Sequence, residues 1–331
     1  MTGGAGFIGV NTAARFLSRG WRVSVLDDLS RKGVQKNLAW LKRQGPIDFA
    51  KLDVRDPGAV RRWAEKRADA RLAFHFAAQV AVTTSVTDPR TDFEVNAYGA
   101  LNVLEALRRL TNKPLTLFSS TNKVYGGMEH VKTILRKGRY AYAGLPQGVG
   151  ELEPLDFHSP YGCSKGAADQ YFHDYTRIYG LPTVVLRQSC IYGQHQQGNE
   201  DQGWLAHFMK AAQAGRGITV YGDGKQIRDA LHIDDLIDLY EAAYRRRALC
   251  AGRVYNIGGG PKNTLSLLEL IQWIEQRQGR KLPVRWSGWR PGDQRVYVSD
   301  IRRARRELGW APRIGVPEGL EKLWAWLEKN P

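Results

Sequence analysis

The sequence is poor in cysteine, and its three cysteines form no recognisable pattern. Cys163, Cys190 and Cys250 are scattered along 331 residues, with neither a CxxC pair nor a His/Cys spacing suited to a metal. An odd and dispersed set of this kind argues against a disulfide framework. We therefore expect no metal site, and reduced thiols in a cytoplasmic protein.

Long apolar runs are also missing. No window approaches the roughly 18 consecutive apolar residues that a membrane-spanning helix requires. The N-terminus does not have the basic-then-apolar layout of a secretory signal, because it opens directly on glycines. We therefore expect no membrane partner.

Negative charge is scarce relative to positive charge, which raises the question of a polyanionic partner. Lys and Arg number 49 against 33 Asp and Glu, so the formal net charge is +16. The basic residues are spread along the chain, and the short clusters at 245–247 and 302–306 fall in helical patterns, where a solvated face is usual. No nucleic-acid recognition motif accompanies them. We expect small anionic ligands, and no nucleic acid, as partners.

Short apolar runs alternate with helical patterns through the first two thirds of the chain. The runs are Arg22–Leu26, Phe49–Leu52, Leu72–Phe76, Leu115–Phe118 and Thr183–Leu186, and the helical patterns include Asn11–Arg19, Phe93–Leu110 and Pro160–Tyr179. Alternation of this kind predicts right-handed βαβ units. The expected fold class is α/β, a doubly wound parallel sheet of Rossmann type with helices on both faces.

Beyond Gly193 the elements become shorter, although Arg253–Ile257 has the pattern of one more buried strand of the sheet. We expect a dinucleotide-binding domain from residues 1–190 and about 226–260. A smaller, discontinuous C-terminal substrate domain would take about 191–225 and 261–331. Such a fold begins with a central apolar strand, yet only Met1 precedes Thr2. We expect this start to lie inside the natural reading frame, or the first strand to have been clipped.

A glycine-rich segment opens the chain. Gly3–Gly9 reads GGAGFIG and contains both GxxGxxG and GxGxxG. Such glycines let the backbone approach a pyrophosphate, whose charge is held by N–H groups at a helix N-terminus. A strand then ends at Asp27, 18 residues after Gly9, where an acid accepts the ribose hydroxyls of NAD. A carboxylate there repels a 2′-phosphate and favours NAD over NADP, although Arg31 and Lys32 weaken that preference.

Two further strand ends suit the same dinucleotide, because ligands bind at the carboxyl ends of the strands in such sheets. Asp53 is expected to accept the exocyclic amine of adenine, and the small residues after Phe76 let the backbone pass close to the cofactor. The residues that we expect to bind the cofactor are Gly3, Gly6, Phe7, Ile8, Gly9, Asp27, Asp53, Val54, Ala77, Ala78 and Lys165.

A Tyr and a Lys four residues apart, Tyr161 and Lys165, give the sharpest catalytic signal. At this spacing they share one face of a helix. A free phenol titrates near 10, and a neighbouring ammonium favours the phenolate, which can then act as a base. Thr121, at the end of the run Leu117–Thr121, offers the third member, a hydroxyl. We expect Thr121, Tyr161 and Lys165 to be catalytic.

These motifs resemble the extended short-chain dehydrogenase/reductases, and the resemblance covers nearly the whole chain. Three longer strings are similar to the CDP-paratose 2-epimerases, also called CDP-tyvelose epimerases: Ser119–Gly126 (SSTNKVYG), Leu155–Tyr171 (LDFHSPYGCSKGAADQY) and Asp201–Trp204 (DQGW). The resemblance implies a homodimer with tightly bound NAD and a nucleotide-diphosphate sugar as substrate. It also implies that Tyr161 is the base and that C2 of the sugar is oxidised and then reduced from the other face.

The same resemblance points to residues on the substrate side. Arg228 and Arg290 occur where related epimerases hold the diphosphate, for which the planar guanidinium is well suited. Asn96 and His232 match family positions, but a hydrogen-bonding or capping role is as plausible for each as a catalytic one. The residues that we expect to bind substrate are Gln79, Thr121, Asn122, Arg228 and Arg290, and Thr83 and His158 are further candidates to face the sugar. Trp204, Trp286 and Trp289 are candidates for stacking on the nucleobase, or else for the core.

Alternatives stay open at this point. A UDP-glucose-type 4-epimerase uses the same base and cofactor, so short motifs do not separate it from a 2-epimerase. A 4,6-dehydratase is disfavoured, because Asn122 and Lys123 stand where that reaction needs carboxyl groups. A non-catalytic NAD-binding or RNA-binding relative is the remote alternative, against which intact Thr121, Tyr161 and Lys165 argue.

Overall fold

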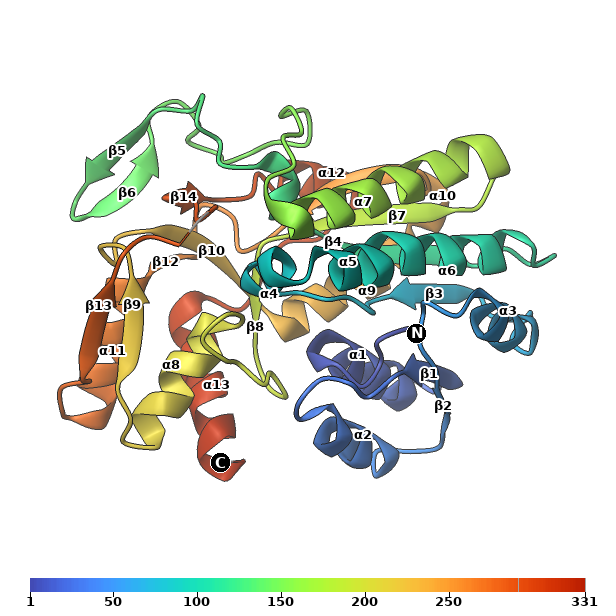
Figure 1. The fold of residues 1–331 in the computed structure, drawn as a ribbon, viewed down its shortest axis with the longest axis horizontal. Helices are drawn as coiled ribbons and strands as arrows, with labels where there is room; N and C mark the ends of the chain where they lie inside the picture. The colour runs from blue at the N-terminus through green and yellow to red at the C-terminus, as the bar shows by residue number, and fades with distance from the viewer. Residues whose placement is uncertain (291, 331) are drawn as a thin grey trace.

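A computed structural model describes residues 1–290 and 292–330. Its first half alternates strands and helices (Figure 1), as the sequence predicts. The elements are α1 (Phe7–Ser18), β1 (Val23–Asp27), α2 (Val34–Lys42), β2 (Ile47–Lys51), α3 (Pro57–Glu65), β3 (Leu72–His75), α4 (Val82–Thr87), α5 (Pro89–Phe93), the π-helix η1 (Glu94–Tyr98), α6 (Gly99–Arg108), β4 (Leu115–Thr121), the 3-10 helix η2 (Asn122–Tyr125), β5 (Thr133–Arg136), β6 (Arg139–Tyr142), α7 (Ser159–Tyr179) and β7 (Thr183–Gln188).

The second half is built from shorter elements. They are β8 (Cys190–Tyr192), α8 (Trp204–Gln213), β9 (Ile218–Tyr221), β10 (Ile227–His232), α9 (Ile233–Arg245), α10 (Arg247–Cys250), β11 (Arg253–Ile257), β12 (Thr264–Ser266), α11 (Leu267–Gln278), β13 (Val284–Ser287), β14 (Val296–Tyr297), α12 (Arg302–Leu308) and α13 (Val316–Lys329).

The main sheet is parallel and confirms the predicted α/β fold class. Its strands run in the order β11-β7-β4-β3, and β1 pairs with β2 beside them. Thr2 joins the two parts through parallel bridges to Leu26 and His75. Met1 and Thr2 thus lie in the middle of the sheet, between β1 and β3.

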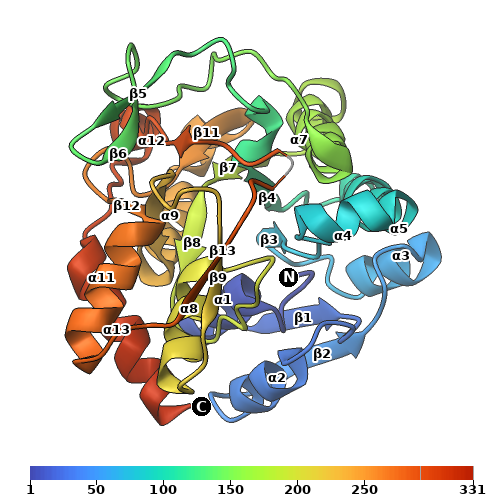
Figure 2. The same ribbon diagram turned by 60° about the vertical axis from the view of Figure 1, so that its left-hand side comes forward.

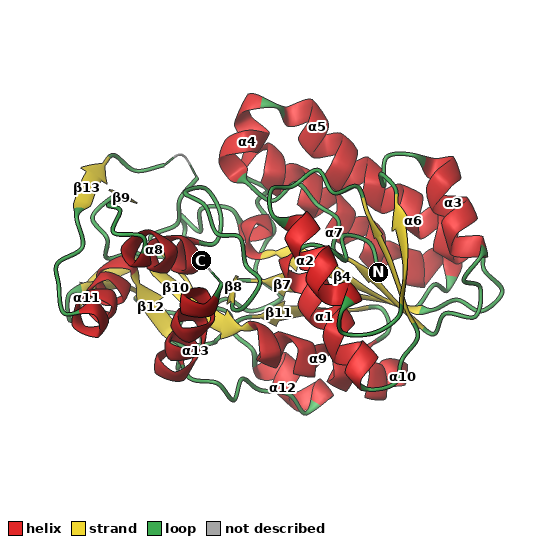
Figure 3. Ribbon diagram, turned by 90° about the horizontal axis from the view of Figure 1, so that it is seen from below, coloured by secondary structure: helices red, strands yellow, loops and turns green. Residues whose placement is uncertain are grey.

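Helices cover both faces of this sheet, as Figure 3 shows with α3, α6 and α7 on one side and α9, α10 and α12 on the other. Side chains of one strand alternate between the two layers: Leu117 packs into the core with α1 and α9, and Phe118 into the core with α3, α6 and α7. Neighbouring residues on β7, Leu186 and Val185, divide in the same way. Because successive side chains point to opposite faces and both faces are buried, the strands are continuous apolar runs in the sequence.

A smaller sheet forms in the second half of the chain. β10 pairs with β12 in antiparallel and with β14 and β8 in parallel orientation. Helices α8, α11 and α13 pack their apolar residues against this part, on the left of Figure 1. β11 returns to the main sheet beside β7, over the residues that the sequence predicts. The boundaries between the two domains stay a proposal, with β10 bonded to the smaller sheet although it lies inside the range 226–260.

Within the described residues, the structure contains no helix that is long and apolar enough to cross a membrane.

Candidate active site

The glycine segment turns tightly between Thr2, which is bridged to β1 and β3, and the start of α1. Gly3 has a φ of +65°, and a Cβ atom there would lie 2.5 Å from the Ala77 nitrogen. A Cβ on Gly9 would lie 2.4 Å from the Gly3 carbonyl oxygen. Gly6 is the N-cap residue of α1 and brings no side chain to its first N–H groups. The segment therefore leaves a helix N-terminus open to an anion, as a pyrophosphate site requires.

Asp27 ends β1 directly beside this segment. Its carboxylate is buried and accepts hydrogen bonds from the backbone N–H of Ala5 (3.0 Å) and of Leu29 (2.9 Å). Burial raises its pKa, and the two backbone hydrogen bonds act in the opposite direction. Asp27 thus fixes the glycine turn in addition to the ribose-binding role that the sequence predicts.

Two adjoining cavities of about 200 and 330 Å³ follow the carboxyl ends of the strands. They share Gly3, Gly6 and Ala78, so together they form one groove across the sheet. All of the predicted cofactor-binding residues line it. The first cavity is lined by Gly3, Gly6, Phe7, Ile8, Gly9, Ala78, Thr121, Tyr161 and Lys165, and the second by Gly3, Gly6, Asp27, Asp53, Val54, Ala77, Ala78 and Gln79.

Asp53 lines the groove, but its carboxylate already has a partner. The Arg55 guanidinium donates to it from Nε (2.9 Å) and Nη2 (2.7 Å), and these hydrogen bonds lower the pKa of Asp53. The predicted contact with the adenine amine must therefore be shared with Arg55.

Tyr161 lies in the first turn of α7, where its backbone N–H donates to Ser85 Oγ (3.1 Å). Thr121 ends β4 and lines the same cavity as Tyr161. One helical turn further on, the buried Lys165 ammonium donates to the Ser119 carbonyl oxygen (2.7 Å) and lies 4.2 Å from the centre of the Phe118 ring. The structure thus brings the three predicted catalytic residues together at one end of the groove.

Burial dominates the electrostatics of this group. It raises the pKa of Tyr161 to about 12; a hydrogen bond with Thr121 and the charge of Arg31 work against this rise, and the charge of Asp92 adds to it. Burial lowers the pKa of Lys165 to about 7. The lysine ammonium bonds to Ser119, so the predicted lowering of the Tyr161 pKa by Lys165 stays a prediction for the cofactor-loaded protein.

The residues predicted on the sugar side meet a loop from the second half of the chain. Asn122 Nδ2 donates to Gln294 Oε1 (3.1 Å), and Lys123 Nζ donates to the Gly292 carbonyl oxygen (3.3 Å). Gln294 Nε2 in turn donates to the Gly126 carbonyl oxygen (2.5 Å). These hydrogen bonds hold η2 against residues 292–294.

The two predicted phosphate-binding arginines lie on either side of this loop. Arg228, on β10, forms an ion pair with Asp293, and the Asp293 N–H donates to the Arg290 carbonyl oxygen (3.2 Å). The Arg290 guanidinium lies 3.8 Å from the centre of the Tyr221 ring and donates to the Glu200 carbonyl oxygen (3.0 Å). Only Arg228 reaches this loop with its guanidinium, whereas the Arg290 guanidinium also forms an ion pair with Asp201 (3.5 Å). A phosphate would therefore have to share Arg228 with Asp293 and Arg290 with Asp201.

Gln79 and Asn96 form hydrogen bonds to each other, although Gln79 also lines the groove. Asn96 accepts from the Gln79 backbone N–H (2.9 Å) and donates to the Gln79 carbonyl oxygen (3.0 Å). The Gln79 side chain also donates to Ala81 O (2.8 Å) and accepts from Ala81 N–H (2.5 Å). Asn96 therefore has the helix-to-loop role that the sequence left open, and the predicted sugar contact of Gln79 stays a prediction.

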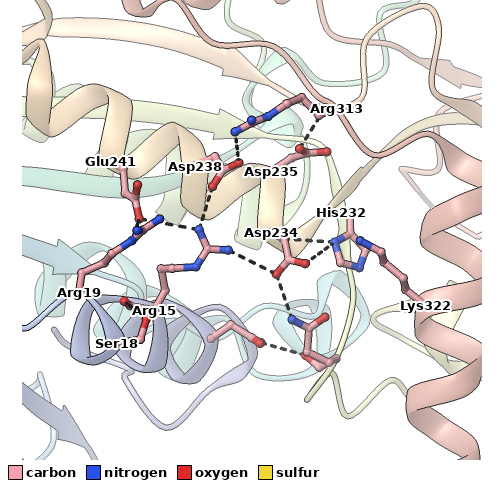
Figure 4. A network of polar contacts seen from close by, with 12 residues as sticks. Arg15, Ser18, Arg19, His232, Asp234, Asp235, Asp238, Glu241, Arg313 and Lys322 are labelled. Carbon is pink, nitrogen blue, oxygen red and sulfur yellow. Dashed lines mark hydrogen bonds and ion pairs between the residues drawn. The ribbon is translucent and has the colours of Figure 1, made fainter. Parts of the chain in front are cut away.

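His232 has the capping role that the sequence also left open. Its Nδ1 accepts from the Asp234 N–H (3.3 Å) at the start of α9. Figure 4 shows this end of α9 joined to α1, where Arg15 reaches Asp234 and Asp238. The network ties the helix that follows the glycine turn to the second half of the chain.

The three tryptophans differ in their surroundings. Trp204 packs against the core formed by α8, α11 and α13, which is the more ordinary of its two predicted roles. Trp286 and Trp289 are exposed, on and just after β13. Trp289 packs over Gly222 and faces Tyr140, so it remains available for stacking on a nucleobase.

A buried ion pair between α7 and β7 is not predicted from the sequence. Asp169 and Arg187, 0% and 4% exposed, form two hydrogen bonds of 2.9 and 3.0 Å. Ser120, next to Thr121, donates to Asp169 (2.6 Å), and Arg187 donates to the Tyr125 hydroxyl (2.9 Å). The pair joins α7, β4 and β7. Its sequence signal is the four-residue spacing from Lys165 to Asp169, which places both on one helical face.

The loop between β8 and α8 is a second part of the site that the sequence does not predict. It covers the groove from the side of the second domain, and no periodic pattern marks it. Its lining residues are His195, Gln196, Gln197, Asn199 and Gln202. Polar residues between Gly193 and Gly203 were its available signal.

A dinucleotide-sized groove at the carboxyl edge of a parallel sheet, ending at a Tyr, a Lys and a Thr, defines a dehydrogenase-type enzyme. The family model for GDP-mannose 4,6 dehydratase matches residues 1–323. The chain belongs to this family, within the NAD-dependent epimerases and dehydratases that the sequence motifs resemble.

Relatives with known names agree with this family over the whole chain. The chain is 44% identical to the CDP-paratose 2-epimerase of Salmonella typhi, over 98% of each chain. It is 32% identical to the UDP-glucose 4-epimerase of Mycolicibacterium smegmatis, over 97% of this chain and 96% of that one. A UDP-glucose 4-epimerase structure from Thermotoga maritima with UDP-glucose superposes with a TM-score of 0.85, at 30% identity, over 99% and 97% of the chains. A UDP-glucuronic acid 4-epimerase from Bacillus cereus, in complex with UDP-glucuronic acid and NAD, gives a TM-score of 0.85 at 26% identity, over 99% and 98%.

Proposed function

We propose that the protein is an NAD-dependent epimerase that inverts C2 of a CDP-activated sugar of the CDP-paratose type. The observation that carries this proposal is the 44% identity to a CDP-paratose 2-epimerase across 98% of both chains. The gathering of Thr121, Tyr161 and Lys165 at one end of the groove supports it. The chemistry proposed is oxidation of the sugar to a ketone, followed by reduction from the opposite face.

The residues of the groove fit NAD. Gly3 and Gly9 stand where a Cβ atom would collide with backbone, and the α1 N-terminus is free to hold a pyrophosphate. The Asp27 carboxylate lies at the end of β1, where it disfavours a 2′-phosphate and so NADP. When bound, the nicotinamide would supply a hydride acceptor in its oxidised form and a hydride donor in its reduced form. We infer that this cofactor stays tightly bound between the two half-reactions.

Tyr161 would take the proton of the sugar hydroxyl. It would return the proton once the keto-sugar has rotated to present its opposite face. Burial holds the phenol in its protonated form, so the base needs its neighbours. Thr121 is one of them, because its hydrogen bond lowers the pKa of Tyr161. Lys165 follows Tyr161 by one helical turn, and its ammonium is held by a hydrogen bond to the Ser119 carbonyl oxygen on β4. Arg31, at the cavity edge, adds a second positive charge.

A UDP-glucose-type 4-epimerase is the second candidate, favoured by the 32% identity to the Mycolicibacterium smegmatis enzyme. Both reactions need the same base, so the position of the sugar decides between them. A dehydratase is disfavoured on chemical grounds, because Asn122 and Lys123 follow Thr121 and neither an amide nor an ammonium acts as a carboxylic acid.

The proposal is tested by offering the protein CDP-, GDP- and UDP-glucose and identifying the inverted carbon by NMR. We expect a manno-configured product, inverted at C2, formed fastest from the CDP sugar. A galacto-configured product, inverted at C4, would replace the proposal by the second candidate. RNA binding at physiological salt without any turnover would remove the enzyme assignment.

Arg228→Ala is expected to raise the KM for the nucleotide sugar about 10- to 100-fold with a smaller change in kcat. The reason is the loss of a charge-assisted hydrogen bond to phosphate, worth about 1.5–3 kcal/mol. Arg253→Ala is the matched control, since Arg253 is exposed at the start of β11. Unchanged KM in Arg228→Ala, measured by initial rates, would show that another cation holds the diphosphate.

We further propose a cytoplasmic homodimer. Helices α5 and α7 lie side by side (Figure 2), and on them Phe93, Tyr171 and Ile178 are 57%, 47% and 64% exposed. A second copy would cover such a face. The free thiols Cys163, Cys190 and Cys250 suit a reducing compartment. Light scattering should give twice the mass of one chain, and a single-chain mass would contradict the dimer.

A further inference from the structure

Asp92 is a buried carboxylate beside the catalytic helix, and neither the motifs nor the proposed mechanism uses it. It lies on α5 and is 0% exposed. The hydrogen bonds that it accepts come from neutral groups: Gln79 Nε2 (2.9 Å), Asn96 Nδ2 (3.1 Å) and the Ser164 hydroxyl. Burying a carboxylate with neutral donors costs free energy that an apolar or amide residue would not. Such an arrangement calls for a functional reason.

The contacts of Asp92 converge on the first turn of α7. Ser164 donates to Asp92 and sits between Tyr161 and Lys165, while its oxygen accepts from Asn96 Nδ2 (3.1 Å). Through Gln79 and Asn96 the same carboxylate is connected to the loop that follows β3 and lines the groove. A single side chain therefore links the catalytic turn to the cofactor side of the site.

Resting on the proposed function, we propose that Asp92 is a positioning residue. It holds the turn that carries Tyr161 and Lys165 against the β3 loop, and its negative charge sets the pH range in which that pair works. It touches neither the sugar nor the cofactor in this role.

The charges around the pair give the direction of the effect. Tyr161 is faced by Asp92 from α5 and by Arg31 from the loop after β1, and Asp92 raises its pKa whereas Arg31 lowers it. Lys165 is faced by Asp169 on its own helix and by Asp92, and both raise its pKa against the effect of burial. Asp88, the N-cap residue of α5, adds to the negative charge there. His75 is kept neutral by burial, which lowers its pKa to about 3.

Removing the negative charge should therefore lower the pKa of both Tyr161 and Lys165. Tyr161 would ionise at lower pH, which moves the acidic limb of the kcat/KM profile down. Lys165 would lose its proton at lower pH, which moves the alkaline limb down as well. A residue with only a structural role would lower the rate without moving either limb.

Asp92→Asn is the direct test, because the amide keeps the volume and its oxygen can still accept from Gln79 and Asn96, while its NH2 group can donate to Ser164 Oγ in place of the bond that Ser164 now donates. We expect both limbs of the pH profile to shift down by about one unit. Glu94→Gln is the matched control. It also removes one negative charge, but Glu94 lies two residues after Asp92 and its side chain is paired with Arg55 (3.4 Å). Limbs that stay in place in Asp92→Asn, or that move equally in Glu94→Gln, would overturn the proposal.

Ser164→Ala separates the link from the charge. It keeps the Asp92 carboxylate but removes the hydroxyl, so we expect about a 10-fold lower kcat with both limbs unmoved. Wild-type kcat in Ser164→Ala would overturn the positioning role. This test can be made even if Asp92→Asn fails to fold.

A titration that needs no turnover distinguishes this proposal from the proposed function. The NAD-loaded protein is labelled with 3-fluorotyrosine, whose phenol is more acidic, and followed by 19F NMR, with the Tyr161 signal assigned from Tyr161→Phe. Asp92→Asn should lower the midpoint of that signal, and an unchanged midpoint would sink the proposal. Failure of every nucleotide sugar to react would remove the proposed function but leave this titration valid.

Discussion

Tyr161→Phe is expected to lower kcat at least about 10³-fold while NAD remains bound in full. General base catalysis contributes roughly 10²–10⁴-fold, and the phenol is the group of the cavity that we assign to proton transfer. Phe keeps the ring and therefore the packing of the first turn of α7, whose backbone bond to Ser85 does not involve the hydroxyl. Turnover is measured by NMR, and bound NAD by its absorbance after the protein has been denatured.

A tyrosine elsewhere on the same helix provides the control. Tyr171 is 47% exposed and lies ten residues after Tyr161, so Tyr171→Phe should retain wild-type turnover. Full activity in Tyr161→Phe would remove the base from the account, whereas loss of NAD together with activity would point to a cofactor-binding role instead.

Asp169→Ala is expected to lower the free energy of unfolding by about 3–5 kcal/mol, the largest stability change that we anticipate. The substitution leaves the Arg187 guanidinium, only 4% exposed, without its carboxylate partner. It also removes the acceptor of the Ser120 hydroxyl on β4. Urea denaturation of the two proteins under identical conditions measures the difference.

Replacing both members of the pair distinguishes an uncompensated charge from simple loss of packing. Asp169→Leu combined with Arg187→Met should lose less stability than either single substitution, because no charge is then left buried. Single substitutions that cost less than about 1 kcal/mol would show that water reaches the arginine, contrary to the burial seen in the structure.

Most strands of the main sheet can be predicted from the sequence, because local patterns encode them. Apolar runs bounded by turns locate the strands, and Arg253–Ile257 is predicted to the residue. Gly3 and Gly9 mark the turn of the glycine segment, because a side chain at either position would collide with neighbouring backbone atoms. The strand-end residues are predictable for a related reason, since the carboxyl ends of parallel strands meet at one edge.

Other features depend on contacts between distant parts of the chain, which local patterns do not encode. The Ser164–Asp92 bond joins residues 72 positions apart. The helical pattern over Phe93–Leu110 is interrupted by the π-helix η1 around Asn96, whose side chain reaches back to Gln79. Arg55 occupies the Asp53 carboxylate, which the sequence assigns to adenine alone.

Electrostatics are the least predictable part of the site. The four-residue spacing places Tyr161 and Lys165 on one face, but it does not reveal how deeply both are buried. Burial moves the pKa of Tyr161 up to about 12 and that of Lys165 down to about 7, opposite to what the base requires. Of the charges nearby, Arg31 lowers the pKa of Tyr161, and Asp92 and Asp169 raise that of Lys165, so these three act against burial.

The central claim is that one C–H bond of the sugar is broken and remade without exchange with water. A nucleotide sugar carrying deuterium at C2 tests it most directly, with the product examined by NMR and mass spectrometry. The account predicts that the inverted product keeps its deuterium at C2, and that unlabelled substrate in heavy water gains none. Loss of the label to solvent, or solvent deuterium at C2, would contradict it.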